Sequence, residues 1–353
     1  MSVNRISFEI TNACNLSCIH CLRDDSLSKK YLPVEYLEKV LVQAKRYGTT
    51  QIVLTGGEPL LHPKIEEMVD HIVGHGYLWH IVTNATLTDR LGKLVLSPER
   101  RKKLIMVSVS LDGAKPETND YIRGEGNFKK IMKATAYLKA QNVPIGFKTS
   151  VNKVNFHDME DIVNLASKLG AAFVEFSHMH PTPELIKQDL ILPRDKWNEI
   201  DREVARLQKI YQMRITICAG SRCSLTFAQC AALQMHDIHF DYQGNMSACC
   251  ILPNYRGTSG SEKDIVGNIG DKDLWDLHSR LVGLLAGVHQ AKIRKIRDNN
   301  LTESDYYQCI FCLKHFGKLD WLSKIDPDNE WLDEKELANG DKKKEEACAK
   351  KAR

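Results

Sequence analysis

Short runs of apolar and β-branched residues alternate, through the first half of the chain, with segments whose apolar residues recur every three or four positions. The runs predict strands, because β-branched and aromatic side chains suit a pleated surface. The segments between them predict amphipathic helices, as in Val34-Leu37-Val40-Leu41-Ala44 and Ile131-Ala134-Tyr137-Leu138. The expected strands cover residues 5–11, 51–55, 80–84, 104–111, 145–151 and 172–178.

Six strand–helix units in series predict an α/β fold with a parallel sheet, since parallel neighbours need a crossover that a helix supplies. We expect this sheet to be curled or doubly wound. In either case functional groups gather at the carboxyl ends of the strands.

The pattern changes after a polar-rich helix expected over residues 194–213. The stretch DIHFDYQGNMSACC reads as two short strands around a Gly244-Asn245 turn, which predicts a β-hairpin. Residues 254–263 look like a loop, and the charged stretch beyond about residue 333 predicts a frayed helix or disordered tail. These changes in pattern divide the chain into two predicted domains, residues 1–213 and 214–320, and a charged tail, residues 321–353.

Composition narrows the class of protein. A net charge of +4, from 49 basic and 45 acidic side chains, gives no polyanion-binding surface, so we expect no nucleic-acid partner. No stretch approaches the roughly 18 consecutive apolar residues of a membrane helix, and the start, MSVNRISFEITNAC, lacks the features of a signal peptide. We expect a soluble, cytoplasmic protein, in which the 11 cysteines act as metal ligands or reactive thiols and not as disulfides.

Three cysteines follow the first expected strand at C-x3-C-x2-C spacing, namely Cys14, Cys18 and Cys21. So short a loop can direct three thiolates at one 4Fe–4S cluster and leave the fourth iron without a protein ligand. The amine and carboxylate of an amino acid can chelate that iron, which would hold the sulfonium of S-adenosylmethionine (SAM) beside the cluster. The alternatives are a structural zinc site with a distant fourth ligand and three thiols without a metal.

The second expected strand ends in Thr55-Gly56-Gly57-Glu58-Pro59. With the cysteine triplet, this segment resembles the radical SAM superfamily, and the resemblance covers about residues 5–320. It implies a partial (β/α)6 barrel, a SAM-binding 4Fe–4S cluster on the three cysteines, and a GGEP segment that binds the amino group of the methionine moiety. The two glycines let the backbone approach a ligand closely. A bare GGEP is also compatible with a simple turn before a helix.

Other positions resemble the family's SAM contacts. Ser110 and Asp112 lie in a segment whose serine contacts the SAM ribose, and Arg123 resembles an arginine that reaches the SAM carboxylate. His20 stands where the family commonly has an aromatic residue near the adenine; it can stack there, and its titration would add pH sensitivity. For all of these, an ordinary solvated side chain is the alternative. Two asparagines at strand ends are further candidates, namely Asn84 and Asn152.

A second cysteine set lies in the C-terminal half. Its members are Cys230, Cys249, Cys309 and Cys312. Their layout, with Gly244 five residues before Cys249, resembles the auxiliary-cluster domains called SPASM in full form and Twitch in shorter form, and implies four thiolates on a second 4Fe–4S cluster. Lys318 stands where a full SPASM domain has its next cysteine, so we expect one auxiliary cluster only. A zinc-ribbon site is the alternative.

Cys250 adjoins the expected ligand Cys249. Some radical SAM peptide epimerases with a compact auxiliary domain use such a thiol as a hydrogen-atom donor, and we predict this catalytic role for Cys250. A paired cysteine without that role is the alternative. Packing in the core is the default for Cys218, Cys223 and Cys348.

The resemblance implies reductive cleavage of SAM to a 5′-deoxyadenosyl radical that abstracts a hydrogen atom from substrate. We expect a ribosomally synthesised peptide, modified by epimerisation or cross-linking, and an electron donor such as flavodoxin or ferredoxin. A dehydrogenase or cofactor-biosynthesis enzyme acting on a small molecule is the alternative, and an electron carrier or zinc-stabilised scaffold belongs to another class. The first strand begins near residue 5, which leaves recognition of a leader peptide to the barrel, to residues 254–263 or to a separate protein.

Overall fold

The computed structural model describes residues 3–24, 27–218, 222, 230–258, 262–326 and 329–332. Its strands form a ten-stranded sheet in the order β10-β9-β8-β1-β2-β3-β4-β5-β6-β7. Neighbours from β8 through β1 to β7 are parallel, and β9 and β10 are antiparallel. The strands are β1 Arg5–Thr11, β2 Gln51–Gly56, β3 Leu78–Thr83, β4 Leu104–Ser110, β5 Ile145–Val151, β6 Phe173–His178, β7 Arg214–Ile217, β8 Asp237–Phe240, β9 Asn245–Ser247 and β10 Ile265–Asn268.

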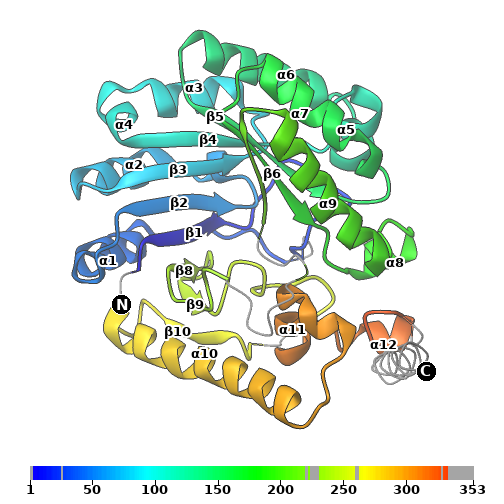
Figure 1. Cartoon of the computed structure of the whole chain (residues 1–353). Coiled ribbons are helices and arrows are strands. Elements are labelled where there is room, and N and C mark those ends of the chain that lie inside the picture. Colours follow the sequence, from blue (N-terminus) through cyan, green and yellow to red (C-terminus); the bar gives the residue numbers. More distant parts are fainter. Residues whose placement is uncertain are drawn as a thin grey trace.

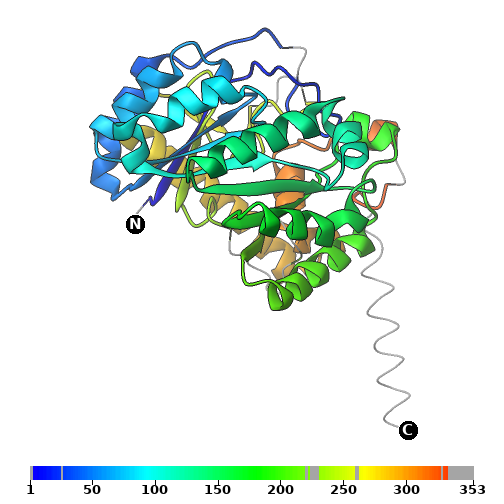
Figure 2. The same cartoon turned by 90° about the horizontal axis from the view of Figure 1, so that it is seen from above.

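Helices cover the outer side of the strands, and α10 runs along the far end of the sheet beside β10 (Figures 1 and 2). The helices are α1 Val34–Ala44, α2 Ile65–Gly74, α3 Thr88–Leu96, α4 Pro98–Lys103, α5 Pro116–Arg123, α6 Asn127–Ala140, α7 Met159–Lys168, α8 Pro183–Lys187, α9 Arg194–Ile210, α10 Leu274–Arg297, α11 Gln308–His315 and α12 Leu322–Ile325. Among the described residues, no helix is both long and apolar enough to cross a membrane.

The predicted parallel α/β sheet is confirmed. All six expected strands form, with β5 at the predicted bounds and β3 beginning two residues earlier, at Leu78. The two quoted helical patterns lie in α1 and α6, and the polar-rich helix is α9, which ends at Ile210.

The segment beyond residue 213 contributes to the same sheet. β7 pairs with β6, and β8 pairs with β1 so that Arg5 lies opposite Asp237. The predicted hairpin is formed by β8 and β9, and Gly244 has φ +84 at its turn, a conformation that glycine adopts without strain. The predicted division at residue 213 therefore falls within a continuous sheet and stays a prediction. Residues 333–353 of the expected tail lie outside the described residues.

The two faces of the sheet differ in polarity. In β1, Ile6 and Phe8 are buried in the apolar core beneath the helices, so alternation turns Ser7 and Glu9 to the opposite, inner face. The same alternation places polar side chains on the inner face of other strands, namely His80, Ser108, Lys148, Glu175 and His239. A barrel interior lined in this way is suited to a polar chamber and not to a packed core.

Candidate functional site

The first three cysteines lie in the loop that follows β1. Thr11 begins the loop, since its Oγ1 accepts a hydrogen bond from the amide of Ala13 at 2.9 Å. A turn joins the last two cysteines, in which the Cys21 amide donates to the Cys18 carbonyl at 3.1 Å. All three cysteine residues are partly exposed, and the Cys18 thiol interacts electrostatically with those of Cys14 and Cys21. The loop thus brings the predicted cluster ligands together.

Burial raises the pKa of two of these thiols. It raises the pKa of Cys18 to about 11, although the nearby Arg123 guanidinium acts in the opposite direction. Burial also raises the pKa of Cys14. Both thiols are therefore protonated at neutral pH in the absence of a metal, and ligation would release their protons.

The Gly-Gly-Glu-Pro segment packs directly on the cysteine loop. The Gly57 amide donates to the Thr11 carbonyl and the Glu58 amide to the Ala13 carbonyl, each at 2.8 Å. A Cβ on Gly56 would lie 2.3 Å from the Thr11 oxygen, and one on Gly57 would lie 2.3 Å from the Ala13 oxygen. Both glycines are thus required by the contact between the two segments.

The Glu58 carboxylate is fully buried and binds protein groups. It accepts hydrogen bonds from the Leu60 amide at 3.0 Å, the Thr83 hydroxyl at 2.8 Å and the Asn84 amide at 2.8 Å. Pro59 opens the 3-10 turn Pro59–Leu61. Glu58 therefore fixes the end of β2 to the end of β3.

Asn84 lies beside the cysteine loop, as its place at a strand end predicted. Its Nδ2 is 4.0 Å from the Cys14 sulfur and donates to Asn15 Oδ1 at 2.9 Å. Asn152 follows β5 at the same edge and is buried, with its Oδ1 accepting from the Val154 amide at 2.8 Å. Contact of either side chain with SAM stays a prediction.

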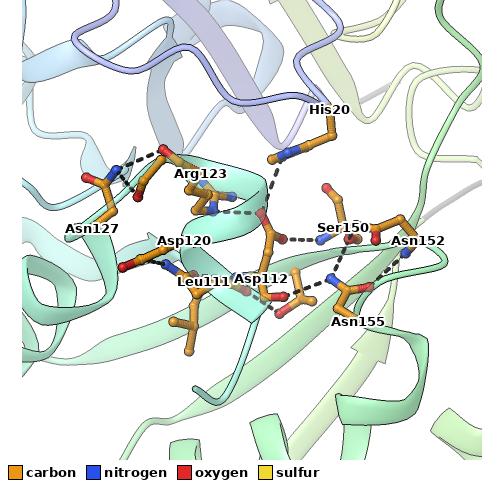
Figure 3. A network of polar contacts seen from close by, with 12 residues as sticks. His20, Leu111, Asp112, Asp120, Arg123, Asn127, Ser150, Asn152 and Asn155 are labelled. Carbon is orange, nitrogen blue, oxygen red and sulfur yellow. Dashed lines mark hydrogen bonds and ion pairs between the residues drawn. The ribbon is translucent and has the colours of Figure 1, made fainter. Parts of the chain in front are cut away.

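Asp112 is the centre of a buried polar network (Figure 3). Its Oδ2 lies 2.6 Å from Nε of Arg123 and 3.4 Å from Nε2 of His20, and its Oδ1 accepts from the Ser150 amide at 2.8 Å. Asp112 has no exposed surface. It therefore holds Arg123 and His20 in place, beside the end of β4 where Ser110 lies.

His20 is neutral near pH 7. Burial lowers its pKa to about 4, with Asp112 opposing this shift and Arg123 adding to it. The pH sensitivity expected from its titration is therefore not found near neutral pH. Its buried Nδ1 has no hydrogen-bond partner among the described residues, which leaves a polar atom for a group bound beside the loop.

The second cysteine set lines a cavity between the hairpin and α11. Cys309 and Cys312 lie on α11, and the walls between the sulfur-bearing residues are mainly apolar, including Leu252, Leu313 and Phe316. The Gln308 side-chain amide donates to the Cys312 sulfur at 3.2 Å. All four predicted ligands, Cys230, Cys249, Cys309 and Cys312, line this cavity.

Within the described part of the chain, no three thiols of either cysteine set lie within 4.8 Å of one another. Tetrahedral zinc, with Zn–S bonds of about 2.3 Å, needs sulfur atoms about 3.8 Å apart. Among the described residues, only Glu38, His71 and His75 bring three possible ligand atoms within 4.8 Å of one another. Neither cysteine set is gathered so tightly, whereas each thiolate of a 4Fe–4S cluster binds a different iron.

Cys250 is exposed, yet burial by surrounding protein is the main cause that raises the pKa of its thiol. Both observations agree if the thiol faces an internal space. The charges of Arg23, Glu9 and Lys148 also act on the pKa of this thiol. Cys218 follows β7, and burial raises the pKa of its thiol to about 12. Cys223 and Cys348 lie outside the described residues.

Comparison with known proteins gives a family match for the part of the chain that holds the first cysteine loop. Residues 8–166, which contain the cysteine loop, the GGEP segment and Asp112, match the family model described as the radical SAM superfamily. Residues 8–166 of the chain thus resemble a radical SAM domain. The predicted cofactors of its first site, a 4Fe–4S cluster and SAM, are those of this superfamily.

Several curated proteins resemble this chain. The AdoMet-dependent heme synthase of Methanosarcina barkeri is 30% identical over 198 residues, which cover 54% of each chain. The mycofactocin maturase MftC of Mycobacterium tuberculosis is 33% identical over 172 residues, or 47% of this chain and 42% of the relative. The matches thus span about half the length of these relatives.

One solved structure resembles most of the chain. Streptococcus suis SuiB, bound to the precursor peptide SuiA, matches with a TM-score of 0.63 and 15% identity over 80% of this chain and 66% of SuiB. At that identity the likeness establishes the fold, and it agrees with the predicted radical SAM barrel.

Sequence reasoning missed two residues of this site, Glu9 and Arg23. Both are charged and largely buried, and they form an ion pair between β1 and the segment after Cys21. A signal was present for Glu9, because a carboxylate interrupts the otherwise apolar end of the strand RISFEIT. For Arg23, the only signal in the sequence was its position two residues after Cys21.

Proposed function

We propose that this protein cleaves SAM reductively at the Cys14/Cys18/Cys21 site and modifies a ribosomally synthesised peptide by hydrogen-atom abstraction. The packing of the Gly56-Gly57 backbone against the cysteine loop carries this proposal, because it brings the segment that we predict to bind SAM against the loop that bears the three thiols. The bound cluster and SAM supply a 5′-deoxyadenosyl radical.

The protein's own residues shape the site and would bind and orient SAM. The two glycines keep the end of β2 against the loop, and Glu58 secures it to β3. Arg123, fixed by Asp112, would bind the SAM carboxylate, and the neutral His20 ring would lie near the adenine. Ser110 would bind the ribose. The polar inner face of the sheet then receives the part of the substrate that reacts.

Cys250 is the proposed hydrogen-atom donor for epimerisation. Its S–H bond breaks as a C–H bond forms on the substrate radical, which leaves a thiyl radical on Cys250. One electron from a reduced flavodoxin- or ferredoxin-type donor and one proton from solvent restore the thiol. The four cysteines that line the neighbouring cavity, among them Cys249, would hold an auxiliary cluster, and such a cluster would supply electron-transfer chemistry next to Cys250.

The substrate class rests on the relatives. The names of the MftC and SuiB relatives refer to a maturase and to a precursor peptide, which supports a peptide substrate here. A small molecule is the second candidate, favoured by the similarity to a heme synthase.

Anaerobic reconstitution with iron, sulfide, reductant and SAM tests the proposal. About eight irons per chain and release of 5′-deoxyadenosine are expected. A peptide encoded beside the gene and an iron coproporphyrin are then offered as substrates. Solvent deuterium in the peptide without loss of hydrogen indicates epimerisation, and loss of a hydrogen pair indicates a cross-link. Stoichiometric zinc without deoxyadenosine would refute the enzyme, and turnover of the porphyrin alone would refute the peptide.

A further inference from the structure

The segments that follow the two cysteine loops are paired with each other. Residues 22–24 come directly after Cys21, and residues 254–256 come shortly after Cys250. The Arg256 amide donates to the Leu22 carbonyl at 2.8 Å, and the Asp24 amide donates to the Asn254 carbonyl at 3.3 Å. Arg23 and Tyr255 thus face each other in an antiparallel bridge. The bridge therefore joins the loop that carries Cys14, Cys18 and Cys21 (the first cluster loop) to the loop that carries Cys249 and Cys250 (the thiol loop).

One side chain adds a second connection. The Arg23 guanidinium donates to the carbonyls of Ile251 at 3.2 Å and Pro253 at 3.0 Å, and also to the carbonyl of Cys250. The Nη2 atom, which donates to the Cys250 carbonyl, also pairs with the Glu9 carboxylate of β1. A single planar group therefore contacts both the strand that precedes the first cluster loop and the backbone of the loop that carries Cys249 and Cys250.

The chemistry of arginine explains this arrangement. A guanidinium has five N–H donors in a fixed plane, so it can serve several carbonyls and a carboxylate together. A lysine ammonium has three donors at one point and cannot span the same set. Glu9 is 3% exposed, and its carboxyl group is the hydrogen-bonding partner of the largely buried guanidinium.

We propose that Arg23, paired with Glu9, is a positioning residue that fixes the Cys249–Cys250 loop relative to the Cys14/Cys18/Cys21 loop. It sets the separation across which a hydrogen atom or an electron passes between the SAM site and the thiol site. This inference rests on the proposed function for the identity of the two sites. The geometric link itself rests only on the contacts of Arg23.

Arg256 is the matched control. Its Nε donates to the Arg23 carbonyl at 3.0 Å, so it joins the same two segments, and its Nη1 lies 3.7 Å from Glu184. These contacts lie at residues 23 and 184, whereas Arg23 contacts the carbonyls of residues 250, 251 and 253. The comparison therefore distinguishes a specific hold on the thiol loop from general attachment of the two segments.

The experiment uses the anaerobically reconstituted protein with both clusters, as wild type, Arg23→Gln, Arg23→Lys and Arg256→Gln. Hydrogen–deuterium exchange of residues 249–253 is expected to become about ten-fold faster in both Arg23 variants, since hydrogen bonds to a charged donor are lost. Arg256→Gln is expected to leave this exchange within about two-fold of wild type. Pulsed EPR of the reduced clusters is expected to give a broader distance distribution in the Arg23 variants only.

Two results would overturn the inference. One is unchanged exchange and an unchanged distance distribution in Arg23→Gln. The other is an equal effect of Arg256→Gln, which would reduce Arg23 to one of several attachments. Iron content and deoxyadenosine release in the wild type test the proposed function separately, because the exchange measurement follows the loop whether or not SAM is cleaved.

Discussion

Glu58 accepts a hydrogen bond from the backbone amide of Asn84 at 2.8 Å, and this bond ties the ends of two neighbouring strands together below the cysteine loop. In Glu58→Gln the side-chain amide turns a donor toward groups that are themselves donors. We expect a loss of about 1–3 kcal/mol in the free energy of unfolding and weaker SAM binding. Urea denaturation and equilibrium dialysis measure the two effects. Glu67→Gln, at a half-exposed position, is the control, and equal stability of both variants would contradict the expectation.

Gly57→Ala tests the contact between the GGEP segment and the cysteine loop. The new Cβ would lie 2.3 Å from a backbone oxygen that cannot move aside cheaply. We expect destabilisation of about 1–3 kcal/mol and reduced iron content after reconstitution. Gly74→Ala is the matched control, because a Cβ there meets nothing within 4 Å at the end of α2. That variant is expected to be as stable as wild type or more stable, by up to about 1 kcal/mol.

Asp112→Asn removes the carboxylate that neutralises Arg123. Both side chains are buried, so the guanidinium would lose its countercharge, and we expect a cost of about 3–5 kcal/mol. Chemical denaturation measures it. Adding Arg123→Gln to Asp112→Asn is expected to recover part of the stability. A double variant as unstable as the sum of the single variants would show that the two groups act independently.

Glu9 is expected to make stability depend on pH. Burial raises its pKa to about 7, with Arg23 opposing the shift and Asp241 adding to it, while the neighbouring His239 is kept neutral by a pKa lowered to about 3. Because the folded-state pKa exceeds the unfolded value, the folded protein binds the proton more tightly. The contribution of Glu9 is therefore complete below about pH 4.5 and is lost as the pH rises to about 7.

Glu9→Gln should remove this dependence. Denaturation midpoints of the wild type and the variant are compared from about pH 4.5 to 7.5, and the difference between the two curves isolates Glu9. The difference is expected to change by no more than about 3 kcal/mol over this range. Parallel curves would contradict the prediction.

The variants Cys250→Ala and Cys230→Ala distinguish the proposed hydrogen-atom donor from a proposed cluster ligand. Cys230 lines the four-cysteine cavity, so its loss is expected to lower the iron content by about four per chain. Cys250→Ala is expected to keep the full iron content and to stop incorporation of solvent deuterium into the product. Iron analysis and mass spectrometry distinguish the two. Loss of iron in Cys250→Ala would make it a ligand and refute the donor role.

The strands of the barrel could be predicted because their signal is local. Runs such as IGFKTSV contain the alternation and the residue types of a half-buried strand, and β5 forms at the predicted bounds. The cysteine loop and GGEP could also be predicted from the sequence, since their chemistry depends on residue types at short spacing. The contact of Gly57 with Ala13 could not be predicted, because it depends on how β1 and β2 pair.

Long-range pairing explains what the sequence could not provide. Nothing within the segment Asp237–Phe240 shows that it lies beside β1, and Arg23 gives no sign of the carbonyls that it contacts more than 200 positions away. The low pKa of His20 likewise depends on burial between Asp112 and Arg123. These features follow from the tertiary arrangement, and short sequence motifs contain no information about it.

The place of β8 beside β1 also affects how the chain folds during synthesis. Arg5 of β1 is translated 232 residues before Asp237, its partner in β8. At roughly 5–20 residues per second, one edge of β1 has no native neighbour for roughly 10–50 s. An unpaired strand edge invites pairing with other chains. The yield of folded protein is therefore expected to depend on translation speed and on chaperones that shield this edge.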